Sequence, residues 1–209
     1  MRINAPVSFG IRHLAPLWPL FAKKHPDVEL EIALIDRVVD IVDEGYDLAI
    51  RISRLGSSAQ PARKLASSRN VVCAAPSYLR KHGRPKLPAD LAMHACIGYT
   101  HAATGNEWHL LDADGVDHVV RANCTMQTNN GDTARGAALA GLGVIWQPTF
   151  LIGDDLRAGR LVEVLPTHHV APTDVLAVYP SRRHLSAKVR VMIDFLADAF
   201  AGTPPWDRP

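Results

Sequence analysis

The polar side chains best placed to do chemistry in this sequence stand where predicted strands end. Ser8, Thr100 and Asn129 each follow a short run with the composition of a buried or half-buried strand. In open α/β sheets, ligands collect at the carboxyl ends of strands, where loop amides and helix N-termini also point. Hydroxyl and amide groups at these ends predict noncovalent binding of a small molecule.

The same rule selects a wider set of candidate binding residues. Ser, Thr and Asn at helix starts also act as N-caps, and for Ser186 we adopt that interpretation. For Ser8, Thr100 and Asn129, capping and ligand contact are both compatible with the sequence. The full candidate set is Ser8, Phe9, Gly10, Ile35, Asp36, Arg51, Thr100, His101, Asn129 and Trp146.

Arg51 is a single charge inside the apolar run of residues 48–52. A guanidinium in such a strand must find an anion or reach the strand end. It either pairs with a local carboxylate as part of the structure or receives an anionic ligand. With Phe9 and Trp146 as apolar walls, the second alternative suits a small organic acid or aromatic acid.

The segment before this strand has the pattern of a short amphipathic helix. Its apolar face would hold Val38, Val39, Ile41 and Val42, and Asp36 is placed to cap its start. Gly45 stands where a helix ends in a left-handed residue.

The elements around these residues predict an α/β fold. Strands over 3–7, 28–35 and 48–52 alternate with helices over about 14–25 and 36–44, which implies a parallel sheet with right-handed crossovers. The remaining predicted elements are strands over 65–75, 95–99, 124–128, 143–146, 161–165 and 175–179, helices over 76–82, 132–141, 148–157 and 186–200, a hairpin of 108–111 with 116–121, and a frayed tail over 202–209.

Two extended crossings, near 67–71 and 168–173, suggest two lobes. Lobe I would comprise 1–68 and 172–209, and lobe II would comprise 69–171, with residues 166–172 as a linker. We expect a ligand to bind between the lobes.

Composition excludes several classes. With 209 residues, 47% hydrophobic and 21% charged, the chain is an ordinary globular protein, and its net charge of +2 is too small to favour nucleic-acid binding. The longest basic run, residues 182–184, is predicted to be a solvated turn. Three scattered cysteines favour reduced, buried thiols in a cytoplasmic protein, with a redox-sensing pair as the alternative. No secretory signal and no stretch of ~20 apolar residues is visible, so no membrane contact is expected.

The segments RINAPVSFGIRHLAP, DRVVDIVDEGYDLAIRI and NVVCAAPSYLRKHG, in this order and spacing, resemble the effector-binding domain of LysR-type transcriptional regulators. The resemblance covers residues 2 to about 200. It implies the fold of type 2 periplasmic binding proteins, with two Rossmann-like lobes joined by two crossover strands. It also implies a small-molecule effector at the candidate loops, a homodimer or higher homo-oligomer, and DNA contact only through a winged helix-turn-helix upstream of this sequence. We therefore expect the regulatory part of a longer protein.

Two other classes stay open. A transporter-associated solute-binding protein shares the implied fold but normally carries an export signal. An enzyme is less compatible, because no G-x-S-x-G, glycine-rich phosphate loop or H-E-x-x-H motif occurs. No catalytic residue, cofactor or metal site is predicted, since the adjacent His168 and His169 cannot both face one metal on regular structure.

The chain also carries an assembly hypothesis. Leu17, Trp18, Leu20 and Phe21 give the helix at 14–25 more apolar surface than one narrow stripe needs, and the strand at 28–35 is predicted at a sheet edge. The resemblance suggests a two-fold dimer in which both meet the helix at 132–140 of the partner. The alternative is that Trp18 or Leu20 packs on the helix at 186–200 within a monomer.

Overall fold

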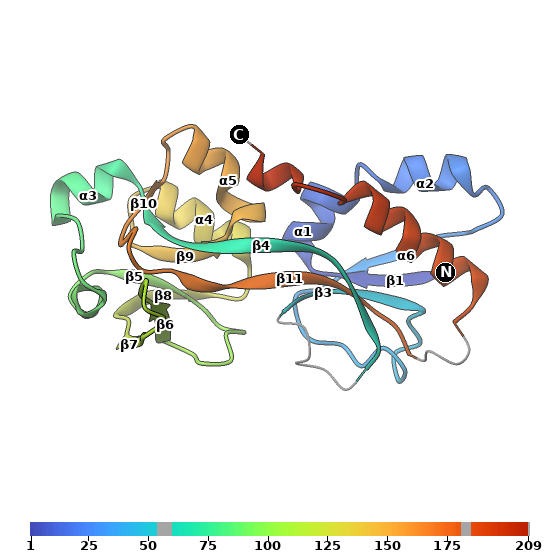
Figure 1. Ribbon diagram of the computed structural model, residues 1–209, viewed down its shortest axis with the longest axis horizontal. Helices are drawn as coiled ribbons and strands as arrows, with labels where there is room; N and C mark the ends of the chain where they lie inside the picture. Colours follow the sequence, from blue (N-terminus) through green and yellow to red (C-terminus); the bar gives the residue numbers. More distant parts are fainter. Residues whose placement is uncertain (54–59, 181–184, 209) are drawn as a thin grey trace. The chain divides into compact units, whose positions relative to one another are not determined.

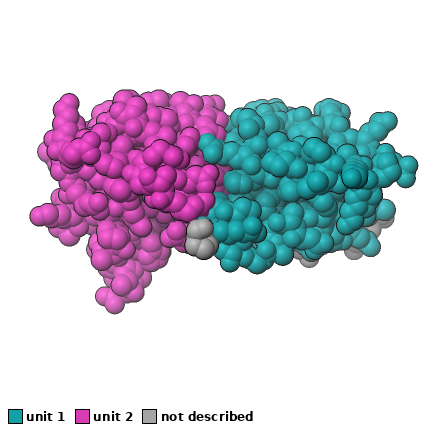
Figure 2. Space-filling model, turned by 90° about the horizontal axis from the view of Figure 1, so that it is seen from above, with its two compact units in different colours: residues 1–68, 173–208 teal, residues 69–172, 209 magenta. Residues whose placement is uncertain are grey.

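The computed structural model describes residues 1–53, 60–180 and 185–208, and these divide into two compact units (Figures 1 and 2). Unit 1 comprises residues 1–68 and 173–208, and unit 2 comprises residues 69–172. The basic run at 182–184 lies outside the described residues.

Unit 1 is built on a parallel three-stranded core. Strand β1 (Arg2–Ala5) pairs in parallel with β2 (Glu31–Leu34) on one side and with β3 (Leu48–Ser53) on the other. Strand β11 (Val170–Val178) then pairs antiparallel with β3. The predicted parallel sheet is therefore present, and β2 ends the strand order.

The first helical segment begins earlier than predicted. It runs from α1 (Val7–Phe9) through a π-helical turn (Gly10–Leu14), and α2 (Trp18–Lys24) follows after a turn. Pro19 lies in the first turn of α2, where a missing amide proton costs nothing. The predicted single helix from about residue 14 is thus wrong, because the prolines split the segment and the chain turns helical directly after Pro6.

Two layers cover the unit 1 strands. In Figure 1, α1, α2 and α6 (Ala187–Ala199) lie on the same side of the strands, and Phe21 of α2 packs edge-to-face on Phe195 of α6. On the other side a cluster forms from Val39, Ile41, Tyr46, Ala49, Leu176 and Val178. The predicted final helix is confirmed, with Val189, Ile193, Leu196 and Phe200 buried.

The helix predicted at 36–44 does not form. These residues make turns, and Val38 and Val42 are 84% and 60% exposed, whereas Val39 and Ile41 are buried. The spacing of two buried residues two positions apart is that of an extended or turning chain, not of a helix. Gly45 does adopt the expected left-handed conformation, with φ of 68°.

The strands of unit 2 form three separate groups of paired strands. Strands β9 (Ile145–Pro148) and β10 (Val162–Glu163) pair antiparallel with β4 (Ala62–Ala74), and β5 (Cys96–Tyr99) pairs in parallel with β8 (Cys124–Thr128). The hairpin of β6 (Glu107–Leu111) and β7 (Asp117–Arg121) is confirmed. The helices are α3 (Pro76–His82), α4 (Gly131–Leu139) and α5 (Thr149–Arg157), with a 3-10 turn at Pro88–Ala92.

Two long strands carry the chain from one unit to the other. β4 passes between units after Ser68, and β11 passes between them after Pro172. The predicted linker at 166–172 is wrong in its second half, because β11 already begins at Val170. Among the described residues, no helix is both long and apolar enough to cross a bilayer.

The tail predicted to fray is ordered instead. Pro205–Asp207 form a 3-10 turn, and the Trp206 side chain is only 4% exposed. A buried indole removes more apolar area from water than any other side chain, which offsets the entropy of ordering a short tail.

Candidate functional site

The carboxyl ends of β1, β2 and β3 meet at one edge of unit 1, because the three strands are parallel. β11 starts its pairing with β3 at the same edge, where Asp174 lies opposite Ser53. This edge therefore gathers the helical connection from Pro6 to Leu14 that carries Ser8, the turn at Ile35–Asp36 and the residue Thr173.

Two hydroxyl groups at this edge are buried and unsatisfied. Within the described residues, neither Ser8 Oγ nor Thr173 Oγ1 has a hydrogen-bond partner, and Ser8 is 5% exposed. A buried polar group without a partner costs free energy, so such groups often mark a ligand or water position. Ser8 was among the predicted residues. Thr173 was missed, although it ends the second predicted crossing.

Phe9 and Gly10 are held firmly against the rest of unit 1. Phe9 is fully buried and packs on His13, Phe200 and Trp206, with ring centroids 5.1, 5.8 and 5.6 Å away. A Cβ on Gly10 would come within 2.4 Å of Leu34 Cδ2, so a larger residue there would require the Leu34 side chain to move. Both residues anchor the segment that carries Ser8 to the rest of unit 1, and Phe9 belongs to the core of the unit.

Asp36 caps a helix other than the predicted one. The amide of Val7, at the start of α1, donates to Asp36 Oδ1 over 2.9 Å. The carboxylate thus sits at the N-terminus of the first helical segment, where the helix dipole favours negative charge. Ile35 beside it is half-buried, and its amide donates to the carbonyl of Ala5 at the end of β1.

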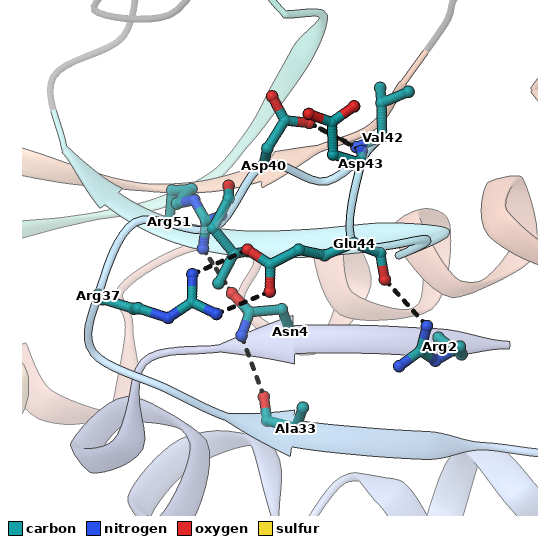
Figure 3. Close-up of polar contacts among 10 residues, drawn as sticks. Arg2, Asn4, Ala33, Arg37, Asp40, Val42, Asp43, Glu44 and Arg51 are labelled. Carbon is teal, nitrogen blue, oxygen red and sulfur yellow. Dashed lines mark hydrogen bonds and ion pairs between the residues drawn. The ribbon is translucent and has the colours of Figure 1, made fainter.

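Arg51 has neutral partners inside unit 1 (Figure 3). Its Nη1 donates to Asn4 Oδ1 over 2.6 Å, and its Nη2 donates to the carbonyl of Val39 over 2.9 Å. Burial lowers the pKa of Arg51, and the nearby Glu44 carboxylate opposes this effect. Arg51 therefore fastens β3 to β1 and to the segment 36–46, which neither predicted alternative foresaw.

Unit 2 has a second strand edge with its own polar residues. The amide of Thr100 donates to the carbonyl of Thr128, which ties the ends of β5 and β8 together. Asn130, not Asn129, caps α4, since its Oδ1 accepts from the amide of Thr133 at 3.0 Å. Thr100, His101 and Asn129 are exposed side chains at this edge.

Trp146 packs half-buried against the hydrophobic core of unit 2. The paired strands β9 and β4 also contain two buried polar residues, Gln147 and Asn70. Asn70 Nδ2 donates to the carbonyl of Ala171 over 2.7 Å, while Asn70 Oδ1 has no partner among the described residues. The Asn70 side chain is therefore only partly satisfied, and Asn70 was not among the predicted residues.

Nearly the whole chain is similar to one family. A model of the LysR substrate binding domain matches residues 1–201. The uncharacterized HTH-type transcriptional regulator YhjC of Escherichia coli K12 is 36% identical over 199 residues, which cover 94% of this chain and 66% of that protein. DmlR, an HTH-type transcriptional regulator of the same organism, is 35% identical over 96% of this chain and 65% of its own length.

This chain belongs to the LysR substrate-binding domain family. The regulatory domain of CrgA, a LysR-type regulator of Neisseria meningitidis, has the same fold with a TM-score of 0.81, 29% identity and coverage of 95% of this chain and 97% of that one. Full-length AphB of Vibrio cholerae gives a TM-score of 0.80 at 28% identity, over 95% of this chain and 67% of AphB. The predicted fold class is confirmed.

The LysR-family chain spans 65–66% of the length of the curated regulators named above. Those relatives are transcriptional regulators, and neither a solute-binding protein nor an enzyme is among them.

The thiols of this LysR-family domain are in unreactive surroundings. Burial raises the pKa of Cys73 above its ordinary value and that of Cys96 to about 12, and it raises the pKa of Cys124. All three cysteines are free, and a thiol is reactive only as the thiolate. Among the described residues, no group of three or more His, Cys, Asp or Glu side chains is placed to hold a metal ion.

Proposed function

We propose that this chain is the effector-binding part of a LysR-type transcription regulator, in which a small molecule changes the activity of a DNA-binding domain elsewhere in the protein. The family match and the names of the relatives support a regulator over a free solute-binding protein. Binding shifts a regulator only by its differential affinity for two states. DNA contact would then lie in the part of the protein that this chain does not include.

The observation that carries the proposal is the buried, unsatisfied hydroxyl of Ser8. It stands at the edge where α/β proteins bind ligands, and Thr173 Oγ1 at the same edge has the same property. An effector that supplies partners to these groups would recover the free energy that their burial costs.

Small organic and aromatic acids are the effectors to screen first. Hydroxyl donors bind carboxylate oxygens through charge-assisted hydrogen bonds, which are the stronger kind. Arg51 contributes less to this choice than its charge suggests, because its guanidinium already has two acceptors. The predicted contacts of Thr100, His101, Asn129 and Trp146 remain part of the proposal.

A thermal-shift screen of small carboxylates and aromatic acids tests the function. A ligand at about 100 times its dissociation constant adds about 2.7 kcal/mol to the stability of the folded state. Ser8→Ala should then reduce the shift by the cost of one hydrogen bond, about 1 kcal/mol. Ser186→Ala is the matched control, since this hydroxyl is exposed and makes no capping hydrogen bond.

A homodimer is the proposed relay. Leu20 of α2 is 58% exposed and Ile11 is 57% exposed, while β2 is a sheet edge. In the alternative, Trp18 or Leu20 packs on α6; Phe21 packs there, and the exposure of Leu20 leaves its side chain available. Sedimentation of this chain should give a dimer, and Leu20→Glu should shift it towards monomer. A strict monomer at high concentration, unchanged by Leu20→Glu, contradicts this surface.

A further inference from the structure

The last residues of the chain lie beyond the family match but are built into unit 1. The LysR model ends at residue 201, whereas Trp206 in the following 3-10 turn is 4% exposed. The tail that follows residue 201 therefore buries its largest side chain and is packed as part of unit 1.

Trp206 contacts the loop that carries Ser8. Its ring centroid lies 5.6 Å from that of Phe9 and 4.7 Å from that of His13, both in edge-to-face geometry. Phe200, at the end of α6, completes the cluster at 5.6 Å from Trp206. Such pairs stabilise beyond their buried area, so the indole holds two residues of one loop at once.

The loop from Pro6 to Leu14 is thereby held on three sides. The amide of Val7 is bound by Asp36, and Gly10 lies against Leu34 of β2. Phe9 is held by the aromatic cluster. Ser8 lies between Val7 and Phe9, which are both held in this way. These contacts therefore fix the position of its buried hydroxyl group.

Trp206 also reaches the strand that leaves unit 1. Its Nε1 donates to the carbonyl of Ser67 over 3.2 Å. Ser67 Oγ donates to Asp174 Oδ1 over 2.9 Å, which ties β4 to β11. β4 passes into unit 2 immediately after Ser68. One side chain therefore touches both the Ser8 loop and a strand that carries the chain between units.

We propose that Trp206 is a positioning residue of the effector site, which fixes the helical segment Pro6–Leu14 and couples it to β4 at Ser67. The name effector site rests on the function proposed above. The coupling itself is a property of unit 1. The coupling means that the segment 6–14 and the tail around Trp206 become ordered together, because the aromatic cluster is complete only when both are in place.

Amide hydrogen exchange, resolved by peptide and compared among three variants, tests the coupling. Trp206→Ala removes both the ring and the hydrogen bond. Trp206→Phe keeps an aromatic ring but removes the donor to Ser67. Tyr46→Ala is the matched control, because it deletes a buried aromatic side chain of unit 1 from the separate cluster with Val39 and Ile41.

In Trp206→Ala we expect exchange of residues 6–14 and of the β4 amides near Ser67 to quicken about ten-fold or more, as local opening becomes easier. The β6–β7 hairpin should keep its wild-type rate. Trp206→Phe should restore the rate of residues 6–14 but not that of the amides near Ser67. Tyr46→Ala should leave residues 6–14 no faster than the rest of unit 1.

Equal acceleration of all peptides in Trp206→Ala, or a wild-type rate for residues 6–14, overturns the proposal. A thermal-shift screen with millimolar acetate, succinate and benzoate, run on the wild-type chain, addresses the function separately. A third outcome is that Trp206→Ala accelerates exchange of residues 6–14 selectively while no compound in a wider panel of small acids and aromatics raises the melting temperature of the wild type. In that case the positioning role stands and the proposed effector function fails.

Discussion

The segment 36–46 and the β6–β7 hairpin are both short, rich in charge and packed on a core, but they are held in different ways. The hairpin is fixed by its own ladder of five residue pairs and by Asp112, whose Oδ1 accepts from the amides of Asp114 and Val116. The segment 36–46 has no such ladder. Its contacts come from distant parts of unit 1, including Arg2, Val7 and Arg51.

Figure 3 shows how side chains replace the missing ladder. Arg37 holds Glu44 through two hydrogen bonds of 2.8 Å, and Arg2 Nη1 donates to the carbonyl of Glu44. Asp40 Oδ1 accepts from the amides of Val42 and Asp43. The contacts of Arg37 and Asp40 lie within the segment, whereas those of Arg2, Val7 and Arg51 come from residues that the local sequence does not contain.

The largest expected effect comes from breaking this long-range support. Arg51→Ala leaves Asn4 Oδ1 and the carbonyl of Val39 without their donors, and each buried group so left costs about 1–3 kcal/mol. We expect the free energy of unfolding to fall by about 2–4 kcal/mol, measured by urea denaturation. Arg121→Ala, at an exposed position of the hairpin, is the control and should have little effect. Unchanged stability together with lost acid binding would instead restore Arg51 as an effector ligand.

A middle-sized effect separates the two valines that a helix would have grouped together. Val39 is 4% exposed and Val38 is 84% exposed. Val39→Ala should lower the free energy of unfolding by about 1–2 kcal/mol, since two buried methyl groups are lost. Val38→Ala should stay within about 0.5 kcal/mol of the wild type. Equal losses at both positions would contradict the difference in burial between Val38 and Val39.

The smallest effect is electrostatic and involves one carboxyl group with a lowered pKa in each region. The hydrogen bond from His118 lowers the pKa of Asp112 in the hairpin, and the hydrogen bond from Arg37 lowers the pKa of Glu44. A lowered carboxyl pKa contributes stability above its unfolded value and loses it as pH falls through the folded value. Stability should therefore decline below about pH 4–5, near the ordinary carboxyl pKa values.

Denaturation curves of Asp112→Asn and Glu44→Gln between pH 7 and pH 3 measure this contribution. Each variant should show a shallower acid decline than the wild type, and added salt should reduce the difference because both pairs are partly exposed to solvent. A steeper decline in either variant would contradict the assigned direction of the pKa shift.

The comparison also explains which elements were predictable. The hairpin follows from Asp112–Gly115, because Gly115 supplies the φ of 79° that the turn needs and the flanking strands alternate. In the segment 36–46, a helical pattern of valines was outweighed by hydrogen bonds from β1 and β3. Local propensity is a weak prior whenever tertiary partners satisfy the backbone in another way.

The residues of the candidate site likewise divide into those predictable from local sequence and those identified only by the tertiary structure. Ser8 was predictable from its place after a strand, since that place follows from the fold class alone. Thr173 and Asn70 were not, because their significance is an unpaired oxygen, and pairing depends on neighbours more than a hundred residues away in the chain. The role of Trp206 was not predictable either, because its partners are distant in the chain and the composition of the tail predicts fraying.

The sequence by itself determined the fold class, the family, the order of most strands and helices and the strand ends where a ligand would bind. These follow from periodicity, turn residues and motifs, which act over a few residues. Only the tertiary structure decided that Asp36 caps α1, that Arg51 fastens the segment 36–46 and that Trp206 holds the Ser8 loop. Each of these contacts joins residues far apart in the chain, and their free energy exists only when the packed unit brings them together.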